Sequence, residues 1–313
     1  MKIAFLNKYQ NNVARGAETF VYELSQRLSK NHEVDVISKI NYFNLLKNKY
    51  DLIIPTNGRA QVVITRMVTW LNGSKMVVSG QSGIGWDDKV NLLVMPDVFI
   101  ALTDKAKNWA KRFNPLVRVE KIPNGVDLNK FSSEGESYKT NLKKPIVLAV
   151  GAFTEQKRLD LAISAVSKLK DASLLLVGGG GGLKEKLESE GKRLLGNRFQ
   201  ILSVPFKEMP KIYRSADVFT LPSASSEAFG NVYVEAMASG LPVVATDDEQ
   251  RREIVGEAGI LMEPTNIDEY SKTLQKALDT DWGDGPRKQA EKFSWETIAE
   301  KYENLFKTLL NKN

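Results

Sequence analysis

The sequence predicts an α/β protein with two βαβ lobes that face each other across a cleft. Three observations predict this fold. Short apolar runs alternate with amphipathic helical patterns from residue 2 to about residue 122. A polar, strand-poor segment follows at residues 131–144, and a second alternation of the same kind begins at Pro145. Such an alternation favours parallel sheets with right-handed crossovers. We therefore expect one lobe over residues 1–142 and a second over residues 143–291.

The first lobe opens as strand, loop, helix and strand. Its expected strands are residues 2–6, 34–38, 51–55, 75–79, 98–102 and 117–122, and its expected helices are residues 18–29, 60–71 and 104–112. Gly16 stands alone in the first loop, so the pattern is not a dinucleotide fingerprint. Ligands of such sheets lie beyond the carboxyl ends of the strands, and we expect Gly16 to line the cleft there. Residues 79–88 are predicted to form a glycine-rich loop.

The second lobe repeats the alternation. Its expected strands are residues 146–150, 173–177, 199–202, 218–221, 243–245 and 259–262, and its expected helices are residues 159–169, 183–195, 207–215, 232–238, 251–255 and 267–278. Five glycines at residues 178–182 indicate a permissive strand–helix connection more than a phosphate cradle. A long amphipathic helix is expected at residues 295–310, with its apolar residues on one stripe.

Composition excludes several classes of protein. The 313 residues are 42% hydrophobic and 26% charged, which suits about two domains. The sequence has no cysteine, so disulfides, thiolate zinc sites and thiol nucleophiles are excluded. Its one histidine excludes histidine triads and multi-histidine metal sites. No apolar run approaches the roughly 20 residues of a membrane span, and the N-terminal run is too short for a signal peptide. We expect a cytoplasmic protein.

The positive charge is uneven. Residues 1–142 hold 20 Lys and Arg against 13 Asp and Glu, whereas the remainder holds 24 against 25. A basic first half favours anionic partners such as phosphates or an anionic membrane surface. A solvated basic face explains the same counts equally well. We expect no nucleic-acid partner, because no nucleic-acid module is recognisable.

Residues 223–246 carry the most chemistry. They indicate a loop, a helix that a glycine ends, and a buried strand. Asn231 is a candidate N-cap of the helix, and Gly230 lets a ligand approach the backbone. The free amides of a helix N-terminus bind anions, and Glu227 and Glu235 can accept hydrogen bonds from hydroxyls. This combination suits a nucleotide sugar. On spacing alone, a surface acid and a helix-face acid around an ordinary turn explain it equally well.

At this point the motifs resemble those of the retaining glycosyltransferases of family four, which have the Rossmann-like, two-lobed GT-B fold. The run Ser-Glu-Ala-Phe-Gly-Asn at residues 226–231, with Glu235, matches the Glu-x7-Glu signature of that family. Further segments resemble the family from end to end: residues 15–18, 122–127, 150–160, 240–245, 252–259 and 294–296. The resemblance implies that the C-terminal helix, residues 292–313, packs back against the first lobe.

The resemblance also implies roles for single residues. The second lobe would bind a UDP-, GDP- or ADP-sugar, with no cofactor and no metal. Glu235 would hold the ribose and Glu227 the hydroxyls of the transferred sugar. The remaining contacts are expected from the amides of Phe229, Gly230 and Asn231, from the charges of Lys157 and Arg158 at the diphosphate, and from Gly16 beneath it.

Two departures from the family pattern bear on activity. Many relatives have an arginine after the strand glycine, where this chain has Ala152, and Arg158 is the expected substitute. Relatives often carry a histidine near the sugar, where this chain has Gln81 and Ser82. Gln81 is expected to hydrogen-bond either a sugar hydroxyl or the carbonyl of an opposing residue. The histidine's absence affects turnover more than donor binding.

The resulting prediction is a retaining, metal-independent hexosyltransferase. It would transfer a hexose from a nucleoside diphosphate sugar to a glycan or a lipid-linked acceptor, in the cytoplasm or at the inner face of the membrane. Two alternatives stay open. One is a nucleotide-sugar-binding GT-B protein with reduced or lost catalysis, and the other is a sugar-nucleotide epimerase.

Overall fold

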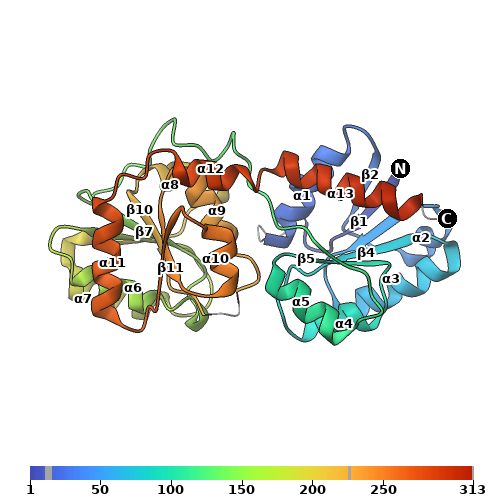
Figure 1. Cartoon of the computed structure of the whole chain (residues 1–313), viewed down its shortest axis with the longest axis horizontal. Coiled ribbons are helices and arrows are strands. Elements are labelled where there is room, and N and C mark those ends of the chain that lie inside the picture. Colours follow the sequence, from blue (N-terminus) through green and yellow to red (C-terminus); the bar gives the residue numbers. More distant parts are fainter. Residues whose placement is uncertain (11–15, 225–226, 312–313) are drawn as a thin grey trace. The chain divides into compact units, whose positions relative to one another are not determined.

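The chain folds into two compact α/β units. The computed structural model describes residues 1–10, 16–224 and 227–311. Unit 1 is Met1–Gly125 together with Trp295–Asn313, and unit 2 is Val126–Ser294. Each unit has a central sheet with helices packed against it (Figure 1). Each sheet has six strands, and all pairings between neighbouring strands are parallel.

The sheet of unit 1 has the strand order β2-β1-β3-β4-β5-β6. The first strand therefore lies inside the sheet, where Ile3 pairs with Val34 on one side and Leu52 on the other. The strands are β1 (Lys2–Leu6), β2 (Glu33–Ile37), β3 (Leu52–Pro55), β4 (Lys75–Ser79), β5 (Val98–Ala101) and β6 (Val119–Lys121).

Helices cover both faces of this sheet. One face is covered by α1 (Gly16–Leu28) and α13 (Trp295–Leu310). The other is covered by α2 (Tyr42–Lys47), α3 (Arg59–Asn72), α4 (Trp86–Leu93) and α5 (Asp104–Phe113) (Figure 1). The ring of Phe20 on α1 lies 6.3 Å from that of Trp295 and 5.8 Å from that of Tyr302. The expected return of the C-terminal helix to the first lobe is thus confirmed.

The sheet of unit 2 has the strand order β12-β11-β10-β7-β8-β9. Its strands are β7 (Ile146–Val150), β8 (Ser173–Val177), β9 (Phe199–Leu202), β10 (Val218–Leu221), β11 (Val243–Thr246) and β12 (Gly259–Met262). The helices are α6 (Leu159–Ser167), α7 (Lys184–Leu195), α8 (Met209–Arg214), α9 (Asn231–Ala238), α10 (Glu249–Val255), α11 (Ile267–Asp279) and α12 (Gly285–Glu291). α6 packs against α7 and α11, while α9 packs against α8, α10 and α12.

Three short helices, α2, α4 and α12, were not expected. α4 begins at Trp86 inside the predicted glycine-rich loop, and Asp87 and Asp88 fall in its first turn. Acidic residues favour that position because they complement the positive end of the helix dipole. A stretch with adjacent acids and nearby glycines therefore looks like a loop although its last part is helical.

The polar segment before Pro145 belongs to unit 2. The chain passes between the units at residues 125–126 and 294–295, compared with the expected positions of 142–143 and 291–292. Phe131 explains the earlier crossing, because its ring packs edge-on against Tyr213 at 5.8 Å. Arg287 adds to this packing by donating hydrogen bonds to the backbone oxygens of Leu128 and Phe131.

Candidate active site

The strand order of unit 2 places a ligand site beside β7. From β7 the chain runs to β8 and β9 on one side, and then to β10 on the other side. In open parallel sheets, ligands bind beyond the carboxyl ends of the strands at the point where the strand order reverses. The loops after β7 and β10 meet at this point in unit 2.

Lys157 and Glu227 come together from these two loops. Lys157 ends a short 3-10 helix (Glu155–Lys157) after β7, and Glu227 lies in the loop after β10. The Nζ atom of Lys157 forms an ion pair with Oε2 of Glu227. The loops also share a backbone hydrogen bond of 2.8 Å, from the amide of Ala224 to the carbonyl of Gln156. The residues predicted for the diphosphate and for the transferred sugar are therefore in direct contact.

The guanidinium of Arg158 holds neighbouring loops together. Its Nε donates to the backbone oxygen of Pro222 at 2.7 Å, and its Nη2 donates to the backbone oxygen of Ser223 at 3.1 Å. Nη2 also donates to Oγ1 of Thr246 at the end of β11, at 3.2 Å. These contacts link the loops after β7, β10 and β11. The contact of Arg158 with a diphosphate stays a prediction.

The start of α9 differs from the expected capping. The helix begins at Asn231, and Gly230 occupies the N-cap position with a φ of 84°. The expectation that Asn231 caps the helix is wrong, because the chain enters through a left-handed residue. A Cβ atom on Gly230 would lie 2.5 Å from the ring of Tyr233. Glycine is thus required both by the backbone angle and by this close approach.

Glu235 lies one helical turn further along α9, where it is buried. Its Oε2 accepts a 2.8 Å hydrogen bond from the hydroxyl of Tyr213. Burial raises the pKa of Glu235 to about 7, although the Tyr213 hydrogen bond and the charge of Lys130 act to lower it. This carboxyl group therefore changes its protonation near neutral pH.

We expect Glu235 to make the protein less stable as pH rises from about 4.5 to about 7. In this range the folded protein keeps a proton on Glu235 that the unfolded chain has lost, so raising the pH favours unfolding. The free energy of unfolding should fall by about 3 kcal/mol from this group. Urea denaturation at several pH values, on wild type and Glu235→Gln, isolates the effect as a difference. Parallel curves for the two proteins would contradict it.

Arg251 is a site-forming residue that the sequence did not reveal. Its side chain is fully buried on α10, where it forms an ion pair with Asp248. Its Nη2 donates to Oγ of Ser223 at 2.6 Å and to the backbone oxygen of Ala224 at 2.9 Å. Its Nε donates to the hydroxyl of Tyr233 at 3.0 Å. The only signal in the sequence was the i, i+3 spacing of Asp248 and Arg251, a common surface pattern.

The two predicted residues of unit 1 follow two different strands of its sheet. Gly16 is the first residue of α1, after β1, and Gln81 follows β4. The Gln81 amide is paired with that of Asn124, through Nε2 to Oδ1 at 2.9 Å and Nδ2 to Oε1 at 3.0 Å. Nε2 of Gln81 also donates to Oγ of Ser79 at 3.0 Å. Two motif residues, Arg15 and Ser226, lie outside the described residues.

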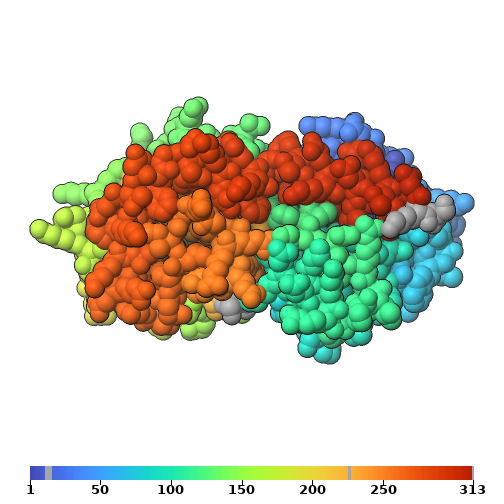
Figure 2. Space-filling view, viewed as in Figure 1, coloured from blue at the N-terminus to red at the C-terminus, as the bar shows by residue number. Residues whose placement is uncertain are grey.

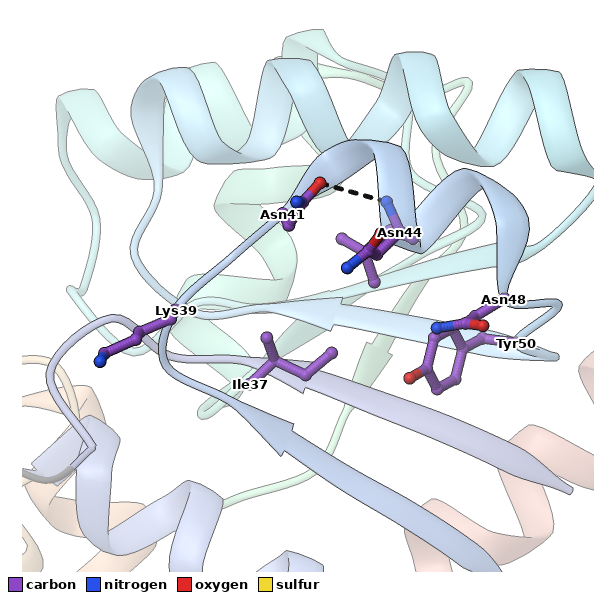
Figure 3. Close-up of a pocket in the computed structure, with 7 residues that line it drawn as sticks. Ile37, Lys39, Asn41, Asn44, Asn48 and Tyr50 are labelled. Atoms are coloured by element: carbon purple, nitrogen blue, oxygen red, sulfur yellow. Dashed lines mark hydrogen bonds between the residues drawn. The ribbon is translucent and has the colours of Figure 1, made fainter.

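A small pocket in unit 1 lies apart from all these predicted residues. It has a volume of about 160 Å³ and lies between the end of β2 and α2. Its lining residues are Ile37, Lys39, Asn41, Asn44, Leu45, Asn48 and Tyr50 (Figure 3). Within residues 1–10, 16–224 and 227–311, no group of three or more His, Cys, Asp or Glu side chains is arranged to hold a metal ion.

The sequence of unit 2 matches a known enzyme family. The family described as glycosyl transferases group 1 matches residues 131–297, which is more than half of the chain. The chain belongs to the group 1 glycosyltransferase family. This match confirms the resemblance inferred from the Glu-x7-Glu motif, and it covers every residue predicted for the donor site in unit 2.

Individual relatives agree with this assignment. An uncharacterized glycosyltransferase of Methanocaldococcus jannaschii is 30% identical over 216 residues, covering 62% of this chain and 55% of the relative. The phosphatidyl-myo-inositol mannosyltransferase of Mycobacterium tuberculosis is 34% identical over 170 residues, covering 52% of this chain and 44% of the relative. The chain therefore spans about half the length of these curated relatives.

Solved structures of glycosyltransferases match the fold over nearly the whole chain. Anabaena HepE in complex with UDP and glucose has a TM-score of 0.80 at 18% identity, covering 98% of this chain and 99% of HepE. Sucrose-phosphate synthase from Thermosynechococcus elongatus has a TM-score of 0.80 at 20% identity, covering 100% of both chains. The predicted GT-B fold is confirmed.

Proposed function

We propose that this group 1 glycosyltransferase transfers a hexose from a nucleoside diphosphate sugar to a glycan or lipid-linked acceptor, with retention of anomeric configuration. The observation that carries the proposal is the contact of Lys157 with Glu227 at the reversal of strand order in unit 2. One residue offers a cation to a diphosphate, and its neighbour offers an acceptor to sugar hydroxyls. The relative named as a phosphatidyl-myo-inositol mannosyltransferase supports a sugar donor and a lipid acceptor.

The donor would lie along the start of α9. Glu235 would accept hydrogen bonds from the ribose, and the amides of Phe229, Gly230 and Asn231 would face the diphosphate and the sugar. HepE, of the same fold, was solved with UDP and glucose, which supports a nucleotide donor here. A helix N-terminus after a left-handed glycine suits a diphosphate, because the free amides and the helix dipole both favour negative charge.

Transfer would break the bond between the anomeric carbon and the diphosphate and form a bond from the acceptor oxygen to that carbon on the same face. The acceptor proton would pass to an oxygen of the departing diphosphate. The negative charge of the leaving group grows as the bond breaks, so Lys157 would stabilise the transition state more than the bound donor. This role needs no enzyme nucleophile and no metal.

Before the donor binds, the Lys157 ammonium is neutralised by Glu227. The diphosphate would take Lys157 from this carboxylate and leave Glu227 available for the sugar. We therefore expect Glu227→Gln to bind a free nucleoside diphosphate more tightly, by about fivefold or ~1 kcal/mol, because no ion pair has to be broken. The same variant should transfer sugar far more slowly, since an amide is a weaker acceptor than a carboxylate.

Calorimetry with UDP, GDP and ADP and assays of diphosphate release from the matching nucleotide sugars check both effects. Asp268→Asn is the matched control, because it removes the partner of Lys168, an exposed ion pair in the same unit. It should change neither quantity. Unchanged turnover in Glu227→Gln would exclude the proposed role of this residue.

A second function is favoured by one observation in unit 1. Gln81 occupies the position where relatives often carry a histidine, and its amide group is paired with Asn124. A protein that binds the nucleotide sugar without transferring the hexose is consistent with this pairing. Donor binding without diphosphate release in the presence of a lipid and glycan extract would favour this second function.

We also propose that the protein acts in the cytoplasm, at the inner face of the membrane, where lipid-linked acceptors are available. Among the described residues, no helix has the length and apolar character to span a bilayer. The positive charge of the first half of the sequence supports attraction to an anionic lipid surface.

A further inference from the structure

The outer surface of α3 is apolar where a surface helix is ordinarily polar. Four of its side chains are exposed, and they form the surface that we call the α3 face: Ile64, Met67, Trp70 and Leu71, with exposed fractions of 38%, 54%, 66% and 75%. Three of them follow the spacing i, i+3 and i+7, which places them on one stripe.

The buried side of α3 is correspondingly less apolar. It buries two valines and two threonines, Val62, Thr65, Val68 and Thr69. The threonine hydroxyls donate to the helix's own backbone, from Thr65 to Gln61 at 2.7 Å and from Thr69 to Arg66 at 3.0 Å. The largest apolar side chains of the helix therefore face outward. Folding of unit 1 does not account for them, and contiguous exposed apolar surface marks an interaction site.

Basic side chains lie beside the α3 face, and neither α3 nor the adjacent α2 contains an acidic residue. The sequence segments 39–50 and 59–72, which include α2 and α3, hold five Lys and Arg and no Asp or Glu. Arg59 and Arg66 form ion pairs with Asp87 and Asp97 of neighbouring elements, whereas Lys39, Lys47 and Lys49 are exposed. The guanidinium of Arg66 lies 5.1 Å from the Trp70 ring centre. On the adjacent α2, the ammonium of Lys47 lies 4.4 Å from the ring centre of Phe43, which is 63% exposed.

The same asymmetry holds between the two units. Unit 1 contains 21 Lys and Arg against 13 Asp and Glu, a net charge of +8, whereas unit 2 contains 23 against 25. Every large apolar side chain that is exposed within the described part of the chain belongs to unit 1. Apolar exposure and positive charge thus coincide in one unit. Figure 2 shows the light-blue and cyan atoms of the range that includes residues 39–72 at the surface of unit 1.

We propose that the α3 face docks unit 1 onto the surface of an anionic phospholipid bilayer. Trp70, Leu71 and Met67 would enter the boundary between headgroups and acyl chains, and Lys47 and Lys49 would contact anionic headgroups. Helices that lie in this boundary combine aromatic and aliphatic side chains with Lys and Arg. The exposed Lys39, Lys47 and Lys49 are complementary to a negatively charged surface, which attracts basic segments within about a Debye length.

This proposal rests on the proposed function, because it brings the protein to the membrane that holds a lipid-linked acceptor. The experiment that tests it measures vesicle binding and needs no sugar transfer. The full chain is mixed with vesicles of phosphatidylcholine alone or of phosphatidylcholine with phosphatidylglycerol, and the bound fraction is measured by sedimentation. We expect binding to the anionic vesicles that weakens with salt. Trp70→Ser with Leu71→Ser should lower the partition coefficient at least about tenfold.

The control variant is Tyr22→Ser, which removes a side chain 56% exposed on α1, on the opposite face of the sheet. It should bind vesicles as the wild type does. Thermal unfolding shows whether each variant is folded, and substitutions at such exposed positions have small effects on stability. The proposal would be overturned if the wild-type protein did not bind anionic vesicles, or if the double variant bound them as the wild type does. A third result would also overturn it: a wild-type protein that is a dimer and binds no vesicles, and a double variant that is a monomer. The α3 face would then contact a second copy of the chain.

Discussion

Replacing Lys157 by alanine is expected to slow sugar transfer by about 10²–10³-fold. The reason is that the departing diphosphate gains negative charge in the transition state, and Lys157 lies at the carboxyl end of β7, beside the predicted sugar ligand Glu227. Because the stabilisation grows as the bond breaks, the loss should fall mainly on kcat. Initial rates of nucleoside diphosphate release, measured over a range of donor concentrations, separate kcat from KM.

Two further variants make this result specific. Lys157→Arg keeps the positive charge and should recover part of the activity. Lys168→Ala removes a lysine of the same unit whose ion pair with Asp268 is exposed, and it should leave the rate unchanged. A Lys157→Ala enzyme with the wild-type rate would remove the central cation from the proposed mechanism.

Replacing Arg251 by methionine is expected to destabilise unit 2 by about 3–5 kcal/mol. The buried guanidinium is the common partner of Asp248, Ser223, Ala224 and Tyr233, and its loss leaves their polar atoms without their donor. The unit should therefore unfold at a lower temperature and at a lower denaturant concentration. Loosening of residues 222–224 should also weaken donor binding, because the same segment precedes Glu227.

The neighbouring residue provides the comparison. Arg252 is 62% exposed at its side chain and forms an ion pair with Asp247 at 2.6 Å. Arg252→Met should cost less than about 1 kcal/mol, because exposed ion pairs contribute little. Calorimetric or urea-induced unfolding of both variants gives the two values. Equal losses would mean that burial of Arg251 does not determine its contribution.

The sequence predicted the two sheets and their helices because each strand is a short apolar run and most helices are long enough to show a period. The period is visible in α6, which was expected at residues 159–169 and spans Leu159–Ser167. It is not visible in α2, whose six residues make fewer than two turns. The sequence did not predict that residues 126–142 belong to unit 2. Phe131 contacts Tyr213 and Arg287, which are distant along the chain.

The candidate site was predictable where a motif fixes both residue type and spacing. Glu227 and Glu235 came from one such motif, and Lys157 came from its resemblance to a diphosphate-binding loop. The contacts that hold the site together were not predictable. Arg158 and Arg251 donate mainly to backbone oxygens and hydroxyls of residues 222–224. Such contacts depend on how strands far apart in the sequence lie in the sheet.

The most direct test of the nucleotide-sugar site proposed in unit 2 is the affinity of the protein for nucleotides with one or two phosphates. Calorimetry would compare UDP with UMP, GDP with GMP and ADP with AMP, on wild type and on Lys157→Ala. We expect that one base is preferred and that its diphosphate binds at least about tenfold more tightly than its monophosphate. Lys157→Ala should lose this preference for the diphosphate. No binding of any diphosphate, or an undiminished preference in Lys157→Ala, would contradict the assignment of unit 2 as the site of a nucleoside diphosphate sugar.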